Sequence, residues 1–187
     1  MQFEALTKQQ IKDVYKKHLM KDFPASERRP LARILKTMDD GNYEAYALTE
    51  DGAVLSYAFF IRNGSAYLLD YLATDEARRS QGLGAAILSQ ARQRLTGASC
   101  ILLEIEDPAC AANEEEKTIR TRRQTFYEHC GYIDTGVRAD TFGVRYVLME
   151  LSMPSPHNAE VLRNIYFDLY RAALPERIAR KFIKIAE

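Results

Sequence analysis

The 187-residue sequence contains no tryptophan, only three cysteines and no excess of charge of either sign. Cys100, Cys110 and Cys130 are odd in number and lack CxxC spacing, so we expect reduced thiols and neither a disulfide framework nor a metal site. Cys100 and Cys130 are expected in the core. The 26 basic and 26 acidic side chains balance one another. Nucleic acid and anionic membranes are therefore not expected as partners.

Long hydrophobic runs are missing as well. No apolar segment approaches the roughly 20 residues that span a bilayer, and the N-terminal MQFEALTKQQ lacks the apolar stretch of a signal peptide. We therefore expect a cytoplasmic protein. Its 47% hydrophobic residues are enough for one domain with a sizeable core.

The apolar pattern alternates between helical and strand periodicity. It predicts two helices before Gly41 and then three antiparallel strands, with tight turns at Asp51-Gly52 and Asn63-Gly64. The rest of the pattern predicts a helix from Gly82, a buried strand at 99–106, a helix at 113–130, two strands up to 152, and two helical stripes (Leu162, Ile165, Tyr166 and Leu169; Ile178, Phe182 and Ile185).

The segment ARRSQGLGAAIL, residues 77–88, places a glycine turn between a strand and a helix. The unpaired N–H groups at such a helix start can bind a phosphate oxyanion, and Arg78 and Arg79 add positive charge. A plain glycine turn with solvated arginines is the alternative. Ile87 replaces the third glycine of a dinucleotide-binding motif, and no Gly-Lys-Ser/Thr ending supports a Walker P-loop.

Two stretches resemble motifs of the GNAT superfamily of N-acetyltransferases. LATDEARRSQGLGAAIL is similar to motif A, Gln/Arg-x-x-Gly-x-Gly/Ala, at residues 79–84, and FYEHCGY at 126–132 is similar to motif B. The likeness covers residues 1–152 and identifies the chain as a bacterial-type small acetyltransferase. It implies an α/β (α+β type) GNAT fold: a mixed, splayed sheet of six or seven strands flanked by helices. The resemblance implies nothing for residues 153–187, but their two apolar stripes predict a C-terminal helical extension, packed on the same domain or at a dimer interface.

The resemblance also implies acetyl-CoA as the acyl donor, bound in a cleft between the strand ending at Thr74 and the strand at 99–106. The backbone of Leu72, Ala73 and Thr74 would pair with the pantetheine arm. The pyrophosphate would be held by the amides of Arg79, Ser80, Gln81, Gly82, Leu83, Gly84 and Ala85. Asn113 matches an asparagine that touches the cofactor in the family, although a helix cap explains it equally well.

Tyr127 occupies the motif position at which the family has a tyrosine beside the sulfur of coenzyme A. A phenol can give its proton to the departing thiolate, so the resemblance implies that Tyr127 is the general acid. The structural alternative is an aromatic side chain that packs on the sheet. Phe126 is the better candidate for that packing role.

The general base is sought among carboxylates on the buried strand. Strand alternation puts Glu104 and Glu106 on one face, where partial burial would favour proton uptake, and we take Glu104 as the candidate. Asp70, Glu106 or water are alternatives for the base. A purely structural Glu104 would pair with an arginine such as Arg123, and a purely structural Glu106 would be solvated.

These features predict an acetyl-CoA-dependent N-acetyltransferase that acts on a primary amine of a small molecule or peptide, by direct attack in a ternary complex. A monomer or homodimer is expected. The alternatives are a non-catalytic acyl-CoA-binding sensor or interaction module, and a nucleotide-binding regulatory domain. In this fold the acceptor site is shaped by the first two helices and the last hairpin, which here supply Tyr15, Asp22, Phe23, Arg138, Asp140 and Phe142.

Overall fold

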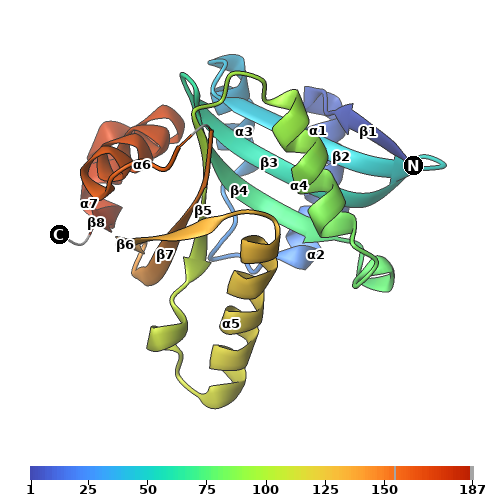
Figure 1. Ribbon diagram of the computed structural model, residues 1–187. Helices are drawn as coiled ribbons and strands as arrows, with labels where there is room; N and C mark the ends of the chain where they lie inside the picture. Colours follow the sequence, from blue (N-terminus) through green and yellow to red (C-terminus); the bar gives the residue numbers. More distant parts are fainter. Residues whose placement is uncertain (154, 186–187) are drawn as a thin grey trace. The chain divides into compact units, whose positions relative to one another are not determined.

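The computed structural model describes residues 1–153 and 155–185. Residues 154, 186 and 187 of the predicted C-terminal extension lie outside that part. The chain divides into two compact units, 1–62 with 69–96 and 63–68 with 97–187, and each is described by itself. In the part of the chain that the structure describes, helices alternate with eight strands (Figure 1), so the predicted α/β class is correct and the predicted strand number of six or seven is too low.

The first unit begins with the two predicted helical segments. Helix α1 (Lys8–Val14) continues through a π-helical turn, η1 (Tyr15–Leu19), into the short α2 (Met20–Asp22), and α3 follows at Leu31–Asp39. Thr7 and Gln10 cap α1 reciprocally. Both segments bury an apolar face, including Ile11, Leu19 and Ile34.

The strands of this unit form antiparallel ladders. Strand β1 (Gln2–Ala5) pairs with β2 (Tyr43–Glu50), and β2 pairs with β3 (Ala53–Asn63). Asp51 and Gly52 both adopt left-handed backbone angles, as a tight hairpin turn requires. The sequence pattern did not predict β1, because its four residues carry no buried side chain.

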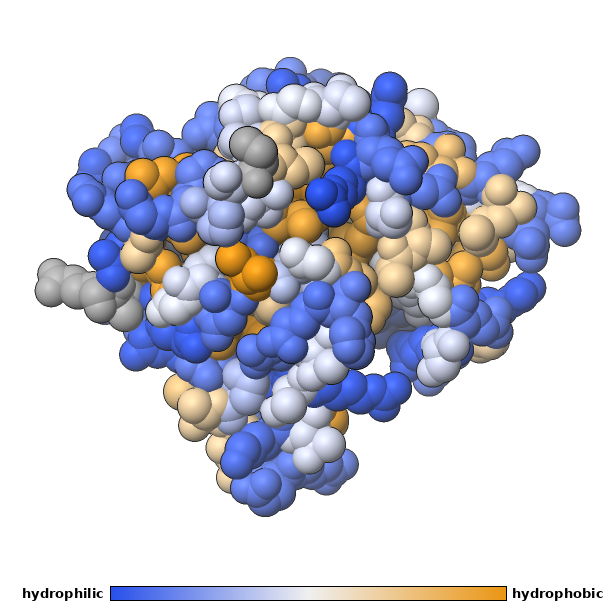
Figure 2. All heavy atoms as spheres, viewed as in Figure 1, coloured by the Kyte–Doolittle hydropathy of each residue, from blue (hydrophilic) through white to orange (hydrophobic). Residues whose placement is uncertain are grey.

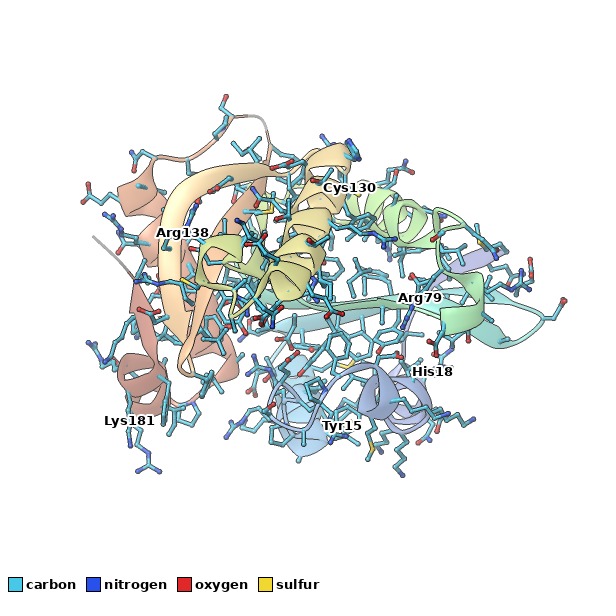
Figure 3. All side chains as sticks on the ribbon, turned by 90° about the horizontal axis from the view of Figure 1, so that it is seen from below. Tyr15, His18, Arg79, Cys130, Arg138 and Lys181 are labelled. Carbon is cyan, nitrogen blue, oxygen red and sulfur yellow. The ribbon has the colours of Figure 1, made fainter. Side chains whose placement is uncertain are left out.

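Strand β4 (Ala66–Thr74) leads into the glycine turn and helix α4 (Leu83–Arg94). Helices α3 and α4 both pack against β2. Figure 3 shows α4 on one face of the strands, with the N-terminal helices, where Tyr15 and His18 are labelled, on the other. The first unit therefore has three layers, and the turn at residues 75–82 connects β4 to α4.

The second unit is built on an antiparallel ladder. Its strands are β5 (Cys100–Glu106), β6 (Ile133–Thr141), β7 (Val144–Ser152) and β8 (Ile183–Ile185), in the order β5-β7-β6-β8. Helix α5 (Glu114–His129) connects β5 to β6. The C-terminal helices are α6 (Ala159–Ala173), which packs on β6, and α7 (Glu176–Phe182).

Two expectations for this unit were wrong. The last helical stripe ends at Phe182, and Ile185 lies in β8 opposite Ala139, so three residues extend the sheet where a helix was predicted. Cys100 is buried as expected, whereas Cys130 is only partly buried. All three cysteines are free thiols. Within the described residues no helix has the length and apolar character that crossing a membrane requires.

Candidate functional site

The turn before α4 has an unusual backbone. Asp75 caps the 3₁₀ turn η2 (Glu76–Arg78) by accepting a hydrogen bond of 2.9 Å from the amide of Ala77. Ser80 and Gly82 then adopt positive φ angles of 63° and 78°. Ser80 tolerates a conformation that side chains rarely adopt, and this bends the chain sharply into the helix.

The amides that follow this turn are available to a ligand. Gly82 is the N-cap of α4 and has no side chain to satisfy the first N–H groups. Within residues 1–153 and 155–185, no acceptor receives a hydrogen bond from the amides of Gly82, Leu83, Gly84 or Ala85. A Cβ placed on Gly82 would meet no atom within 4 Å. The turn thus has the open space and the aligned donors that a pyrophosphate requires.

Two arginines stand beside these amides. Arg79, labelled in Figure 3, lies at the turn before α4 and makes an ion pair of 3.6 Å with Glu76. Arg78 lies 3.5 Å from Glu50. Both arginine side chains are about half exposed, and such surface pairs contribute little stability. Either guanidinium can therefore move toward an anion at modest cost.

The end of β4 is held by the neighbouring strand of the same unit. The Ser56 hydroxyl donates to the carbonyl of Ala73 at 2.8 Å and lies 3.2 Å from the hydroxyl of Thr74. Leu72, Ala73 and Thr74 are all partly exposed. The proposed pantetheine-binding backbone is thus ordered by β3 but not sealed from solvent.

Tyr127 lies in the last turns of α5, and its ring is only 9% exposed. It packs edge to face against Phe126 and Tyr132. Burial raises the pKa of Tyr127 to about 12, opposed by the positive charge of Arg123. Among the residues that the structure describes, none hydrogen-bonds to the Tyr127 hydroxyl. The phenol is therefore protonated and has its hydrogen bond still to give.

Phe126 does not have the role expected from the sequence. Tyr127 is the buried aromatic residue here, whereas Phe126 is partly exposed and lines an open hollow of about 630 Å³. That hollow is lined by α5 alone, through Glu114, Lys117, Thr118, Thr121, Arg122, Thr125, Phe126 and His129. In Figure 2 the tip where α5 begins is largely hydrophilic, consistent with its three successive glutamates.

Glu104 is bound by two tyrosines of the C-terminal helix. The hydroxyl of Tyr170 donates to Glu104 Oε2 at 2.7 Å, and the hydroxyl of Tyr166 donates to Glu104 Oε1. Arg123, the expected structural partner, instead pairs with Glu106 at 3.2 Å. Glu104 is partly buried within the strand. These contacts were not predicted, because 62 residues separate Glu104 from Tyr166 in the sequence.

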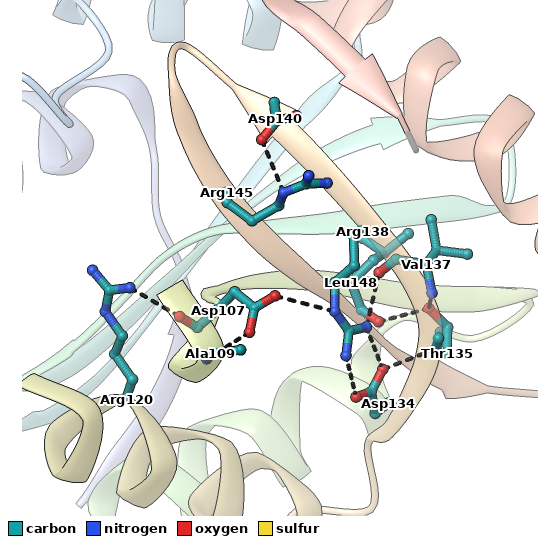
Figure 4. A network of polar contacts seen from close by, with 11 residues as sticks. Asp107, Ala109, Arg120, Asp134, Thr135, Val137, Arg138, Asp140, Arg145 and Leu148 are labelled. Atoms are coloured by element: carbon teal, nitrogen blue, oxygen red, sulfur yellow. Dashed lines mark hydrogen bonds and ion pairs between the residues drawn. The ribbon is translucent and has the colours of Figure 1, made fainter. Parts of the chain in front are cut away.

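Glu106 forms ion pairs with two arginines. The structural alternative, a solvated carboxylate at the end of the strand, was therefore wrong. The Glu106 carboxylate pairs with Arg120 at 3.3 Å and with Arg123 at 3.2 Å. Arg120 also donates to the carbonyl of Asp107 at 2.9 Å (Figure 4). The side chain of Asp107 in turn lies 3.4 Å from Arg138. Glu106 therefore ties α5 to β5.

Asp70, the third carboxylate considered as a base, is almost fully buried in a bidentate ion pair with Arg29, at 3.1 and 3.2 Å. The hydroxyl of Tyr43 donates to it at 2.6 Å. The amide of Arg29 also donates to the hydroxyl of Tyr71. Asp70 thus anchors the loop before α3 to β4, which is a structural role.

Asn113 caps α5, as its alternative reading predicted. Its side-chain oxygen accepts a hydrogen bond of 2.9 Å from the amide of Glu116, and Glu116 reaches back to the amide of Ala112 at 2.6 Å. The hydrogen bond to Ala112 lowers the pKa of Glu116. The cap uses only the oxygen of the Asn113 side chain and leaves its NH₂ group to other partners.

The residues expected to shape the acceptor site are held by neighbours in their own unit. Arg138 pairs with Asp134 at 2.9 Å and Asp140 pairs with Arg145 at 3.1 Å (Figure 4). In the first unit, Asp22 accepts from Tyr57 at 2.8 Å and Tyr15 donates to the carbonyl of Arg29 at 3.0 Å. Phe23 packs against Tyr71, and Phe142 stacks on Phe182.

Comparison with known families identifies the family of the chain. Residues 41–134 match the model of the GNAT acetyltransferase domain. The matched segment contains the glycine turn, β5 and Tyr127. The chain belongs to the GNAT acetyltransferase family, as the two sequence motifs predicted. A search of curated proteins finds no match.

Solved structures that are named as acetyltransferases have a similar fold. A GNAT-family protein from Bacteroides thetaiotaomicron is similar over 91% of this chain and 96% of its own, with a TM-score of 0.69 and 22% identity. The ribosomal-protein-S18-alanine N-acetyltransferase of Escherichia coli is similar over 84% of this chain and 97% of its own, with a TM-score of 0.63 and 18% identity. An aminoglycoside 6'-N-acetyltransferase solved with coenzyme A is similar over 84% of this chain and 100% of its own, with a TM-score of 0.61 and 18% identity. At these identities the likeness concerns the fold.

Proposed function

We propose that this protein is an acetyl-CoA-dependent N-acetyltransferase that acetylates a primary amine of a small molecule or peptide by direct attack in a ternary complex. The observation that carries the proposal is the row of amides from Gly82 to Ala85 that donate to no described residue. A GNAT domain with such a row is suited to hold the pyrophosphate of coenzyme A.

The acyl donor is acetyl-CoA, which supplies the acetyl thioester when bound. The residues assigned to hold it are those of the turn and the adjoining strand end. Amides from Arg79 to Ala85 are assigned to the pyrophosphate, although the amide of Arg79 donates to the carbonyl of Glu76 at 3.4 Å in this structure. The backbone of Leu72, Ala73 and Thr74 is assigned to the pantetheine arm. The NH₂ group of Asn113 is assigned to the same ligand. One neighbour in fold is solved with coenzyme A, which supports the choice of donor.

Two side chains are assigned to the proton transfers. Glu104 accepts a proton from the ammonium group of the acceptor, directly or through water, so that the neutral amine can form the new C–N bond. The carbon–sulfur bond breaks, the hydroxyl of Tyr127 gives its proton to the leaving thiolate, and the nitrogen of the new amide loses its second proton to solvent. Each group then returns to its starting state through solvent.

The environment of Tyr127 fits a donor that loses its proton only during the reaction. Its pKa of about 12 keeps the phenol protonated at every physiological pH. In free solution a thiolate is a weaker base than such a phenolate, so full proton transfer would be unfavourable. The same desolvation that raises the pKa of Tyr127 also raises the pKa of a thiol beside it, so the difference between the two pKa values becomes smaller.

The acceptor is assigned as a class. The neighbours of similar fold include enzymes named for an alanine of a ribosomal protein and for an aminoglycoside, which are both amine acceptors. The polar and aromatic residues near the first helices and the last hairpin suit either a small amine or a peptide N-terminus. The molecule is expected to work as a monomer or homodimer.

The Tyr127→Phe variant tests the proposal, because it removes one oxygen atom and keeps the buried ring. Turnover, measured as free thiol release with an amine substrate, should fall about 10²- to 10⁴-fold with little change in the Kd for acetyl-CoA. Wild-type turnover in the folded variant would exclude Tyr127 as the acid. Tight binding of acetyl-CoA by the wild type, without turnover of any amine, would indicate the non-catalytic sensor.

A further inference from the structure

Helix α6 brings two phenols to one carboxylate of strand β5. Tyr166 is fully buried and Tyr170 is 5% exposed, and their hydroxyls donate to the two different oxygens of Glu104. Tyr166 and Tyr170 are four residues apart, so both project from the same side of the helix. This geometry fixes the plane of the carboxylate as well as its position.

The phenol of Tyr166 is itself held in place. Its hydroxyl lies 2.6 Å from the hydroxyl of Thr141 on β6, and its ring packs edge to face on Tyr170 at 5.2 Å. Burial and the nearby negative charge of Glu104 raise the pKa of Tyr166 well above its ordinary value. Tyr166 is therefore protonated at any working pH and acts toward Glu104 only as a donor.

We propose that Tyr166 and Tyr170 are positioning residues for the general base, so that the C-terminal helix is a working part of the active site. This inference rests on the proposed function, in which Glu104 takes the proton of the amine. Two donors stabilise the ionised form of a carboxylate. A carboxylate has about four lone-pair positions, so two phenols can orient it while it still accepts a proton from a substrate.

Other charged groups lie on either side of Glu104 and its two tyrosines, on the same face of the sheet. Toward the end of β5 lies Glu106 with its partners Arg120 and Arg123. Toward the start of β5 lies Glu150, whose carboxylate is 2.5 Å from the ring of His157. Glu106 pairs with two arginines and Glu150 with a histidine, whereas the hydrogen bonds described for Glu104 come from the two phenols. Removal of either phenol therefore takes away one described donor to Glu104.

The test uses Tyr166→Phe and Tyr170→Phe in the full-length protein, with the pH dependence of kcat/KM as the readout. Each variant should move the acid limb to higher pH by about one unit, because one donor to the ionised carboxylate is lost. At the optimum kcat should fall about three- to tenfold, with the KM for acetyl-CoA unchanged. The double variant should move the limb further than either single change.

Two controls separate positioning from packing. Leu162→Ala removes a buried side chain of α6 that does not bond to Glu104, and it should lower the melting temperature without moving the acid limb. Tyr46→Phe removes a phenol that donates to a different carboxylate, that of Glu44, and it should leave the pH profile unchanged. Tyrosine variants that lose stability like Leu162→Ala but keep the wild-type profile would overturn the inference.

The Glu104→Gln variant distinguishes this failure from a failure of the proposed function. Glutamine keeps the size and accepts a hydrogen bond but cannot take up the proton. Loss of turnover in Glu104→Gln with unshifted tyrosine variants would refute the positioning role alone. Wild-type turnover in Glu104→Gln would refute the base itself, and the inference with it, while leaving acetyl-CoA binding and Tyr127 to be judged separately.

Discussion

Replacement of Gly84 by alanine should strengthen the fold and leave acetyl-CoA binding intact, whereas replacement by valine should weaken binding. Gly84 is the second residue of α4 and has an ordinary helical backbone, since it is not among the residues with positive φ. Alanine is favoured over glycine inside a helix by about 0.5 to 1 kcal/mol. The free energy of unfolding should therefore rise by up to that amount.

The effect on binding should depend on the size of the side chain. Alanine is one of the two residues that motif A has at this position, whereas the branched side chain of valine would stand in the row of amides to which we assign the pyrophosphate. Valine should disrupt one hydrogen bond to a charged group, which is worth about 1.5 to 3 kcal/mol. The Kd of Gly84→Val for acetyl-CoA, measured by calorimetric titration, should rise about ten- to a hundredfold, while that of Gly84→Ala should stay near the wild-type value. Native affinity in a folded Gly84→Val protein would refute the assignment of this turn.

A second pair of variants controls for backbone strain. Gly82 and Gly41 have nearly the same φ, +78° and +77°, and a Cβ on either would meet nothing within 4 Å. Alanine should therefore destabilise both positions by a similar amount, about 1 kcal/mol. Only Gly82→Ala should also weaken acetyl-CoA binding. Equal loss of affinity in the two variants would show that strain, and not the ligand, explains the result.

Three further predictions concern single side chains. Asp70→Asn breaks the buried pair with Arg29 and should cost about 3 to 5 kcal/mol of stability in denaturant unfolding; a stable variant without turnover would make Asp70 the base. Asn113→Asp keeps a good helix cap but removes the NH₂ group, so stability should hold while acetyl-CoA binds several-fold more weakly; unchanged affinity would reduce Asn113 to a cap. Tyr127 keeps its proton to about pH 12 in the folded state, whereas the unfolded chain releases it near pH 10. The contribution of the protonated phenol to the free energy of unfolding is therefore complete below pH 10 and is lost between about pH 10 and 12. Over that range the free energy of unfolding of the wild type, measured in denaturant, should fall more than that of Tyr127→Phe.

The two motifs made the family predictable, and local turn signals made most strands of the first unit predictable. Hairpin turns at Asp51-Gly52 and Asn63-Gly64 define β2, β3 and β4, because Asp-Gly and Asn-Gly pairs favour positive φ angles. The glycine turn predicted the start of α4 and its open amides. Both features depend on neighbours in the chain, and local chemistry is readable from a sequence.

The partners of the carboxylates could not be predicted in the same way. Arg29 and Asp70 are 41 residues apart, and Tyr166 and Glu104 are 62 apart. Strand alternation showed that Glu104 and Glu106 share a face, but it could not say which helix covers each one. Strand β8 was missed for a related reason, since its three residues are stabilised by pairing with β6 and not by a pattern of their own.

The central claim is acetyl transfer to an amine. The direct measurement incubates the wild-type protein with acetyl-CoA and a panel of primary amines, including aminoglycosides and short peptides with free N-termini. Free thiol and acetylated amine are then quantified in the same samples. We predict that at least one amine gives thiol release matched one to one by an acetylated product. Saturable acetyl-CoA binding with thiol release no faster than in the absence of amine, across the whole panel, would contradict the account.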